Sequence, residues 1–474
     1  MIYDTVIRGG QVVTAEAVFE ADIGIAGGKI AALGSGFDGV EVVDATGLMI
    51  TPGGIDPHCH IEQMSGMGVM NADTFETATR SAAMGGTTSV ISFAAQQKGQ
   101  RLSETIGDYA TRAKRGAAID HAFHIIVSDT SVLNFEFDLR ELITAGHRSI
   151  KIFTTYNIML EDAEILRILT LARDAGALTC VHAENDALIA ETRAKLLAEG
   201  KTAPKHHAAS RPRAAEIEAV SRLCHFAKET GAPVMLFHIS TAEAVAMIRA
   251  ARAEGTPIWA ETCPHYLFMT EDALDKPGIE GAKWMCSPPQ RTEVDQAALW
   301  QALALGDLQI VSSDHAPYRF DETGKLSNGA DAPFPDIANG LPGLEVRLPL
   351  MFDAMISQGI LGPEAFVRLT ATAPAQLYGL QDKGHIAPGY DADLVLWDPT
   401  ATRTYGADDL HDNVGYNPWE GTTITGLPVA TYLRGHAIMR DGAYLGQPGT
   451  GEWLKRTTIG TRPADLKPIP KATP

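Results

Sequence analysis

The segment of residues 149–184 reads SIKIFTTYNIMLEDAEILRILTLARDAGALTCVHAE and shows the alternation of strand and helix on which the fold is built. It opens with the apolar segment SIKIF (149–153) and closes with a second one, ALTCVHAE (177–184). Between them, residues 163–176 place apolar side chains at helical spacing and end on a glycine, which is a common helix stop signal. A strand, a helix and a strand in this order predict two parallel strands joined by a crossover helix.

The same alternation runs from about residue 55 to residue 375. Residues 214–231, AAEIEAVSRLCHFAKETG, again combine helical spacing with a final glycine. Repeated strand–helix units predict a parallel sheet, and their number favours closure into a TIM-type (β/α)8 barrel, with an open doubly wound sheet as the alternative. The other candidate strands are TTSVISF (87–93), HAFHIIV (121–127), PVMLFHIS (233–240), PIWAETC (257–263) and LQIVSSD (308–314).

Both ends of the chain read as short strands separated by glycine-rich turns. Apolar and polar residues roughly alternate in residues 3–14 and 21–34, and strand-like segments return in residues 384–398 and 428–446. We therefore expect both ends to build one small β-sandwich domain beside the barrel. The predicted parts are 1–54 (N-terminal part of the sandwich), 55–378 (barrel), 379–450 (C-terminal part of the sandwich) and 451–474 (a proline-rich tail, loose or lying on a partner subunit).

The composition argues against several kinds of partner. The 474 residues include 39 Lys and Arg against 58 Asp and Glu, a formal charge of −19, which disfavours binding to nucleic acid or to an anionic membrane. The chain lacks an apolar run of membrane-spanning length and a signal peptide at its first residues. Its five scattered cysteines are typical of reduced thiols, so we expect a cytoplasmic protein.

His58 and His60 stand at the end of the apolar segment LMITPGGIDPHCH (48–60). Side chains two residues apart on a strand point to the same side, so this pair presents two imidazoles to one ion. A histidine pair with this spacing is common, and alone it is weak evidence for a metal site.

Four further polar residues lie in or at the carboxyl end of predicted strands, which is the end that carries the active site in α/β barrels. Any one of these four residues alone could be an ordinary core or rim residue whose polar group is hydrogen-bonded within the protein. Burying all of them without partners would be very costly, whereas metal ions satisfy them together. Glu184 and His315 follow two of these ligands in the chain, and we expect them to support the ligands. The four are Lys151, His182, His238 and Asp314.

Lysine is the unusual member of this set, because a protonated ammonium repels a metal ion. Two routes remain open for Lys151. It is a neutral amine, or it has reacted with CO₂ to form a carbamate whose two anionic oxygens bridge two ions.

The motifs taken together resemble the hydantoinase/dihydropyrimidinase family of the amidohydrolase superfamily. The likeness extends over essentially the whole chain, including the divided β domain. As a set and in this order, the motifs are specific. They are GGIDPHCH (53–60), KIFTTY (151–156), VHAEN (181–185), HISTAEA (238–244), ETCPHYL (261–267), SPPQR (287–291) and SSDHAP (312–317).

The resemblance implies two divalent metal ions, most simply Zn²⁺, bridged by carboxylated Lys151. It assigns His58 and His60 to the more buried ion. It assigns His182 and His238 to the more exposed ion.

The same resemblance implies the catalytic and substrate-binding roles. Asp314 would bind the buried ion and shuttle protons, and Tyr156 would polarise the substrate carbonyl. The main chain at Ser287 and Asn339 would hold the cyclic amide.

The reaction implied is the opening of the cyclic amide bond of hydantoins or dihydropyrimidines to N-carbamoyl amino acids. A metal-bridging hydroxide attacks the ring carbonyl. A metal and the hydroxyl of Tyr156 hold the oxyanion, and Asp314 passes a proton to the leaving nitrogen. The resemblance also implies a homotetramer, with a homodimer as the alternative.

One segment departs from typical hydantoinases. GLPGLEVRLP (340–349), directly after Asn339, resembles allantoinases and dihydroorotases more closely, so an allantoinase or another cyclic ureide or imide hydrolase is the alternative enzyme. Residues 61–63 lack the arginine that a dihydroorotase needs, and Tyr156 favours a hydantoinase over an allantoinase. A non-catalytic scaffold of this fold is disfavoured because all six ligand positions are present.

The loop IEQMSGMGVMNADTF (61–75) carries Met64, Met67 and Met70 beside the predicted site. Methionine side chains are flexible and apolar. They predict either a wall for a substrate side chain, with Met64 and Met67 as contacts, or ordinary packing under the loop.

Overall fold

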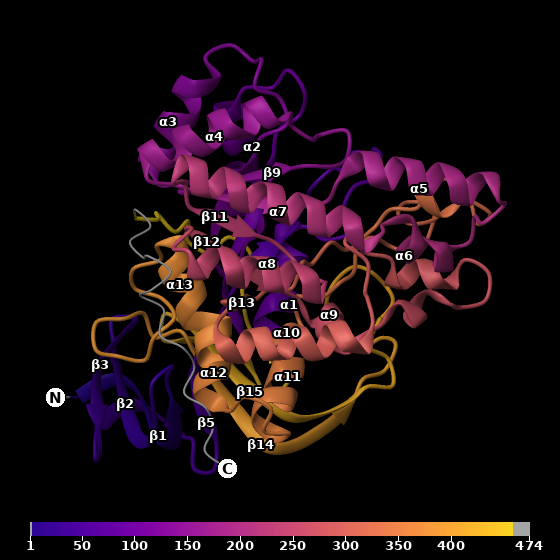
Figure 1. Ribbon diagram of the computed structural model, residues 1–474. Coiled ribbons are helices and arrows are strands. Elements are labelled where there is room, and N and C mark those ends of the chain that lie inside the picture. Colours follow the sequence, from indigo (N-terminus) through magenta and orange to yellow (C-terminus); the bar gives the residue numbers. More distant parts are fainter. Residues whose placement is uncertain (1, 458–474) are drawn as a thin grey trace.

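The computed structural model describes residues 2–457 (Figure 1). Residues 451–457 of the predicted tail lie on the barrel of the same chain, where Nη1 of Arg456 donates to Oγ of Ser149 at 2.6 Å, and the remaining residues of the tail lie outside the described range. Eight parallel strands follow one another in chain order. Cys59 and His315 form a parallel bridge, and His60 N donates to the His315 carbonyl at 2.7 Å, so the segment after the last strand returns to the first. This closure confirms the barrel and excludes the open sheet. The strands are β6 (Gly54–Cys59), β7 (Thr87–Ala95), β8 (Asp120–Ile126), β9 (Ser149–Phe153), β10 (Leu178–His182), β11 (Val234–Leu236), β12 (Ile258–Thr262) and β13 (Ile310–Val311).

Two strands end before the metal-ligand candidate that the sequence places on them. β11 stops at Leu236 and β13 at Val311, whereas the apolar pattern extends each strand to its metal-ligand candidate. His238 and Asp314 have φ values of +42° and +46°, which an extended strand cannot accommodate. The chain turns out of the sheet at both ligands. The predicted boundaries were therefore wrong here.

The longer helices pack on the outside of the barrel. α4 and α7 end as predicted, because Gly176 and Gly231 follow them with φ values of +73° and +65°, a conformation that glycine adopts readily. α7, α8 and α10 lie side by side across the barrel (Figure 1). These helices are α1 (Phe75–Met84), α2 (Leu102–Gly116), α3 (Phe135–Ala145), α4 (Asp162–Ala175), α5 (Asp186–Ala198), α7 (Arg213–Thr230), α8 (Ala242–Ala253) and α10 (Glu293–Leu305).

Short helical turns fill the connections. Within residues 2–457, no helix combines the length and the apolar character needed to cross a membrane. The short elements are η1 (Pro204–His206), α6 (His207–Ser210), α9 (Pro264–Phe268), η2 (Glu271–Leu274), η3 (Glu280–Trp284), η4 (Phe334–Asp336), α11 (Arg347–Phe352), η5 (Asp353–Ser357), α12 (Pro363–Val367), η6 (Arg368–Thr372) and α13 (Ala373–Tyr378).

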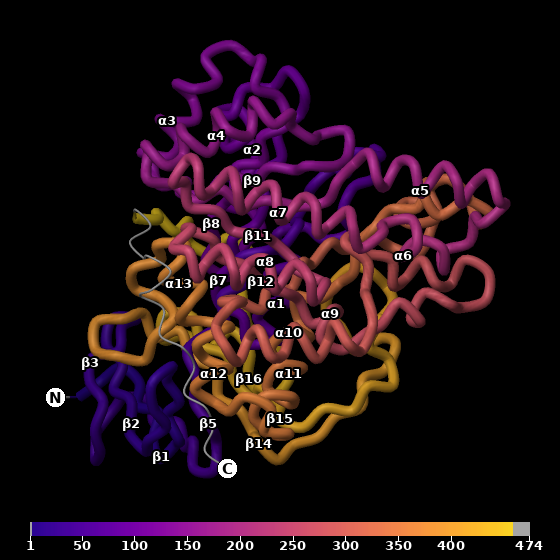
Figure 2. Tube along the Cα trace, viewed as in Figure 1, coloured from indigo at the N-terminus to yellow at the C-terminus, as the bar shows by residue number. Residues whose placement is uncertain are grey.

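Both ends of the described chain share a second sheet. β14 pairs antiparallel with β5, with Leu394 opposite Pro52, so the indigo and orange segments lie side by side at the lower left of Figure 2. The buried Lys383 joins this sheet to the barrel, because its Nζ donates to Asp120 at 2.6 Å and to Asp393 at 2.7 Å. The sheet agrees with the predicted sandwich domain, while the exact domain limits stay a prediction. Its strands are β1 (Ile2–Val13), β2 (Val18–Ala26), β3 (Lys29–Gly34), β4 (Asp38–Asp44), β5 (Met49–Pro52), β14 (Leu394–Thr404), β15 (Thr423–Leu433), β16 (His436–Arg440) and β17 (Ala443–Tyr444).

Candidate active site

The carboxyl ends of the barrel strands open into a cavity of about 540 Å³. Met67 lines this cavity, whereas Met64 does not. The main chain of Met64 pairs with Met70, which holds it in the loop, so the geometry gives no support to Met64 as a substrate contact. The other predicted site residues all line the cavity: His58, His60, Lys151, Tyr156, His182, His238, Ser287, Asp314 and Asn339.

His58 and His60 face the same carboxylate. Nε2 of His58 lies 3.0 Å from Oδ1 of Asp314, and Nε2 of His60 lies 3.4 Å from the same oxygen. Nδ1 of His58 contacts Oε1 of Glu261. Nδ1 of His60 lies 2.7 Å from Oε1 of Gln63. Glu261 and Gln63 thus hold both rings with Nε2 turned toward Asp314.

The contact between His58 and Asp314 requires a cation. Nδ1–H of His58 donates a hydrogen bond to the carboxylate of Glu261, so in a neutral ring the Nε2 lone pair and the carboxylate of Asp314 would face each other as two acceptors. Burial by itself lowers the pKa of His58, but the carboxylates of Asp314 and Glu261 raise it to about 9. A proton or a divalent ion satisfies this position. The ligand atoms of His58, His60 and Asp314 lie within 4.8 Å of one another, and this donor set suits zinc and related ions.

His182 and His238 form a second group of imidazoles. Their ring centroids lie 4.4 Å apart, and the His238 centroid lies 5.4 Å from that of His58. Nε2 of His182 lies 2.7 Å from Oε2 of Glu184, as predicted for a supporting residue, and this leaves Nδ1 for a ligand. Burial lowers the pKa of His182 to about 4 and that of His238 well below its ordinary value. Both rings are therefore neutral donors of the kind that binds a metal.

Lys151 lies on β9 among aromatic rings. Its Nζ is 4.0 Å from the ring centroid of Phe237, 4.8 Å from that of Phe153 and 5.6 Å from that of Phe93. Burial lowers the pKa of Lys151 to about 7, although Asp314 opposes the shift. The amine is thus held where a permanent ammonium is disfavoured.

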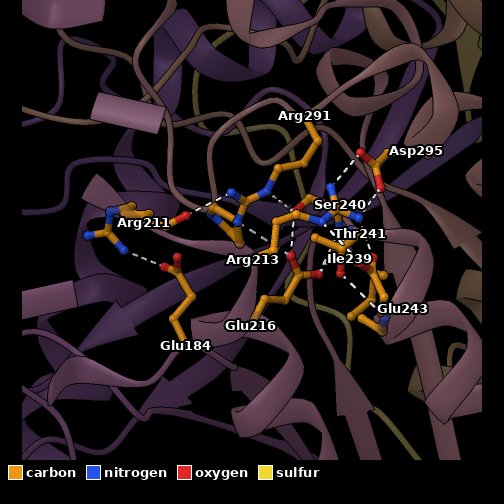
Figure 3. Close-up of polar contacts among 12 residues, drawn as sticks. Glu184, Arg211, Arg213, Glu216, Ile239, Ser240, Thr241, Glu243, Arg291 and Asp295 are labelled. Carbon is orange, nitrogen blue, oxygen red and sulfur yellow. Dashed lines mark hydrogen bonds and ion pairs between the residues drawn. The ribbon is translucent and has the colours of Figure 1, made fainter. Parts of the chain in front are cut away.

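Behind His182, a buried ion pair supports Glu184 (Figure 3). The guanidinium of Arg211 pairs with Oε2 of Glu184, the oxygen that also contacts His182. Nη1 of Arg291 donates to the Arg211 carbonyl at 2.7 Å. These contacts fix the ring of His182 from behind.

The same network continues to the loop that carries His238 (Figure 3). Nε of Arg291 donates to Oγ of Ser240 at 3.2 Å, and Ser240 N donates to Oε1 of Glu216 at 2.8 Å. Ser240 stands two residues after His238. One chain of polar contacts therefore supports both histidines of the second group.

Tyr156 leaves β9 with a φ value of +71°. Asp186 holds this turn, because its Oδ1 accepts from Thr155 Oγ1 at 2.8 Å and from Tyr156 N at 3.3 Å. Cζ of Arg211 lies 5.0 Å from the tyrosine ring centroid. Burial raises the pKa of Tyr156 to about 12, although Arg211 opposes the shift. The hydroxyl stays protonated and can donate a hydrogen bond in the cavity.

The GLPGLE segment (340–345) forms part of the wall. Gly343 N donates to Nδ1 of His315 at 3.1 Å, and Ala316 N donates to the Leu341 carbonyl at 2.9 Å. His315 therefore ties this segment to the loop after Asp314 instead of contacting a metal-ligand side chain.

Sequence reasoning missed Glu261, Gln63 and Asp186. Glu261 carries the signal that singled out Lys151, namely a charged residue inside an apolar strand. Gln63 lies in a loop and Asp186 at a helix start, where polar residues are ordinary. Their contacts are visible only in three dimensions.

The sequence matches a known family and its members over most of the chain. The family model described as Amidohydrolase family matches residues 49–438. The chain belongs to the amidohydrolase family. A D-hydantoinase from Geobacillus stearothermophilus is 40% identical to this amidohydrolase over 464 residues, which cover 97% of this chain and 98% of that enzyme.

Solved structures agree with this amidohydrolase over nearly the whole chain. The dihydropyrimidinase from Brevibacillus agri NCHU1002 superposes with a TM-score of 0.93 at 39% identity, covering 96% of this chain and 99% of that chain. The L-hydantoinase (dihydropyrimidinase) from Arthrobacter aurescens superposes with a TM-score of 0.87 at 27% identity, covering 96% and 100%. These relatives confirm the predicted resemblance and the fold.

Proposed function

We propose that this amidohydrolase opens the cyclic amide bond of hydantoins and dihydropyrimidines to give N-carbamoyl amino acids. The observation that carries the proposal is the convergence of four imidazoles, Lys151 and Asp314 on one cavity beside Tyr156. The D-hydantoinase that is 40% identical over 97% of the chain supports the same substrate class.

The donor set supports a centre with two divalent ions, and Zn²⁺ is the ion that we propose. Imidazole and carboxylate ligands suit it. Bound ions of this kind supply an acidified water as the nucleophile and polarise the carbonyl. The proposed ligands are His58, His60 and Asp314 for one ion, His182 and His238 for the other, and carboxylated Lys151 for both.

Carboxylation of Lys151 is proposed from its surroundings. Within residues 2–457, no carboxylate forms an ion pair with its Nζ, although the four imidazoles of the proposed ligand set share its cavity. A carbamate would replace a group that repels metal ions by an anion that attracts them.

The remaining steps belong to protein side chains. Asp314 accepts the proton of the attacking water and passes it to the leaving ring nitrogen. The protonated hydroxyl of Tyr156 donates a hydrogen bond to the carbonyl oxygen as negative charge develops there. The main chain at Ser287 and Asn339 holds the ring of the substrate.

Hydrolysis of 5-benzylhydantoin tests the function. The zinc-loaded protein should release the N-carbamoyl amino acid, and the chelator-treated protein should not. If the loaded protein leaves this compound intact, allantoin and other cyclic ureides and imides become the substrates to examine.

Three finer assignments belong to the same proposal. The five unpaired cysteines agree with the cytoplasm as the location. A homotetramer, or a homodimer, is the proposed assembly. Small cyclic amides, and neither nucleic acid nor membranes, are the proposed partners.

A further inference from the structure

One wall of the cavity is a single face of helix α5. Asp186, Ile189 and Arg193 line the cavity, and their spacing of three and four residues places them on one side of the helix. Asp186 lies at the inner end, where it holds Tyr156. Arg193 stands two turns further along, about 10 Å away at 1.5 Å per residue.

The three residues differ in whether their side chains are available to bind a ligand. Oδ1 of Asp186 is engaged by Thr155 and Tyr156, and Ile189 is buried. Arg193 is exposed, and no ion pair or hydrogen bond of its guanidinium is found within residues 2–457. Helical side chains lean toward the helix N-terminus, so Arg193 leans back toward Tyr156.

The other arginine of the cavity is already paired. Arg211 forms its ion pair with Glu184 and lies against the Tyr156 ring. Arg193 is therefore the cation of this wall that remains available to a ligand.

The chain around Arg193 has an unusual charge for this protein. Residues 193–211, RAKLLAEGKTAPKHHAASR, contain five Lys and Arg against one Glu, in a chain whose formal charge is −19. Arg193, His207, Ser210 and Arg211 from this segment line the cavity. Lys201, Lys205 and Arg211 are paired with Glu199, Asp275 and Glu184. Arg193 and Lys195 form no ion pair within residues 2–457, so these two cations can attract small anions to this border.

We propose that the preferred substrates of this site are cyclic amides whose ring carries a side chain ending in a carboxylate, and that Arg193 binds this carboxylate. The inference rests on the proposed function and names its substrate class. With the ring held beside Tyr156, the side chain runs outward along the α5 face, past Ile189. A carboxylate two or three carbons from the ring then meets the guanidinium.

The chemistry is the proposed hydrolysis without a further reactant. Water adds to the ring carbonyl and the carbon–nitrogen bond breaks. The hydroxyl of the water stays on the carbonyl carbon and one hydrogen goes to the ring nitrogen. The carboxylic acid formed then releases its proton to the solvent and becomes a carboxylate. The product is an N-carbamoyl amino acid with two carboxylates.

Two substrates of equal shape and different charge test the inference. They are 5-(2-carboxyethyl)hydantoin and its primary amide, 5-(2-carbamoylethyl)hydantoin. The zinc-loaded wild type should show the higher kcat/KM for the acid. R193Q should lower the ratio of the two kcat/KM values about tenfold, mainly through KM, because the contact is remote from the reacting bond. R140Q removes an exposed arginine outside the cavity and should leave the ratio unchanged.

The possible results are distinguishable. Equal kcat/KM values for acid and amide in the wild type, or an unchanged ratio in R193Q, would overturn the carboxylate preference and leave the proposed function standing. Failure of the zinc-loaded wild type to open these two compounds and 5-benzylhydantoin would overturn the proposed function, and the inference with it.

Discussion

Nε2 of His58 lies 3.0 Å from Oδ1 of Asp314, across the edge where the barrel closes. His58 lies in the first barrel strand, one residue before its end at Cys59, and Asp314 follows the last strand. The contact that requires a cation thus lies directly beside the main-chain bridge between Cys59 and His315 that closes the barrel. Stability of the closed barrel and metal binding should depend on each other.

Glu261→Gln should weaken zinc binding about 10–100-fold, because the carboxylate that orients His58 and raises its basicity is lost. Competition with a chelator measures the affinity. Glu229→Gln, which removes an exposed carboxylate on α7, is the matched control and should bind zinc like the wild type. Equal affinities in the two variants would remove Glu261 from the metal site.

Lys151→Ala should lose bound metal and nearly all activity, because the proposed bridge between the two ions is absent. Metal content by elemental analysis and hydantoin turnover measure the two effects. In the wild type, intact-mass analysis under native conditions should show the added mass of CO₂. Full activity in Lys151→Ala would rule out the carbamate.

Tyr156→Phe should keep both metals and lower kcat about 10²-fold or more, because one donor to the developing oxyanion is removed. Steady-state kinetics and metal content on the same sample separate this effect from damage to the metal centre. An unchanged kcat would exclude Tyr156 from the mechanism.

Glu216→Gln should loosen the loop that carries His238, because Glu216 accepts from both the main chain and the hydroxyl of Ser240. We expect the metal content to fall from two ions toward one per chain, with the fold retained by circular dichroism. Glu243→Gln, on the exposed side of the same network, should keep two ions. A Glu216→Gln protein with two tightly bound ions would show that the loop holds its position without this carboxylate.

Asp295 should contribute stability that disappears in acid. Burial alone would raise its pKa, but the guanidinium of Arg213 and the N–H groups of Ala242 and Thr292 lower it well below its ordinary value. A carboxylate whose pKa is lowered by folding stabilises the folded protein at pH values above its pKa in the unfolded chain, which is about 4 for Asp. This stabilisation is lost as the pH falls from about 4 toward the lower pKa of the folded protein.

Asp295→Asn should therefore lower Tm at pH 7, and the difference from the wild type should shrink below about pH 4. Thermal melts across this pH range measure it. Asp408→Asn, at an exposed position, should have no such effect. A difference in Tm that is independent of pH would assign the effect of Asp295→Asn to lost packing.

Much of the fold could be predicted because it depends on local patterns. β9 coincides with the predicted segment SIKIF, and α4 and α7 end at the predicted glycines. Polar residues inside apolar strands indicated Lys151 and His182 for the same reason. Met64 shows the limit, because its place outside the cavity depends on the path of a loop.

The order of strands and helices and the residue types that can bind metal could both be predicted, since both follow from spacing along the chain. The residues that support those ligands could not be predicted, because they come from distant parts of the chain. Glu261 lies 203 positions from His58 in the chain. Arg291, in the connection between β12 and α10, donates to Ser240 in the loop that carries His238. Such contacts arise when barrel closure brings distant strand ends together, and no local pattern encodes the distances or the left-handed turns at His238 and Asp314.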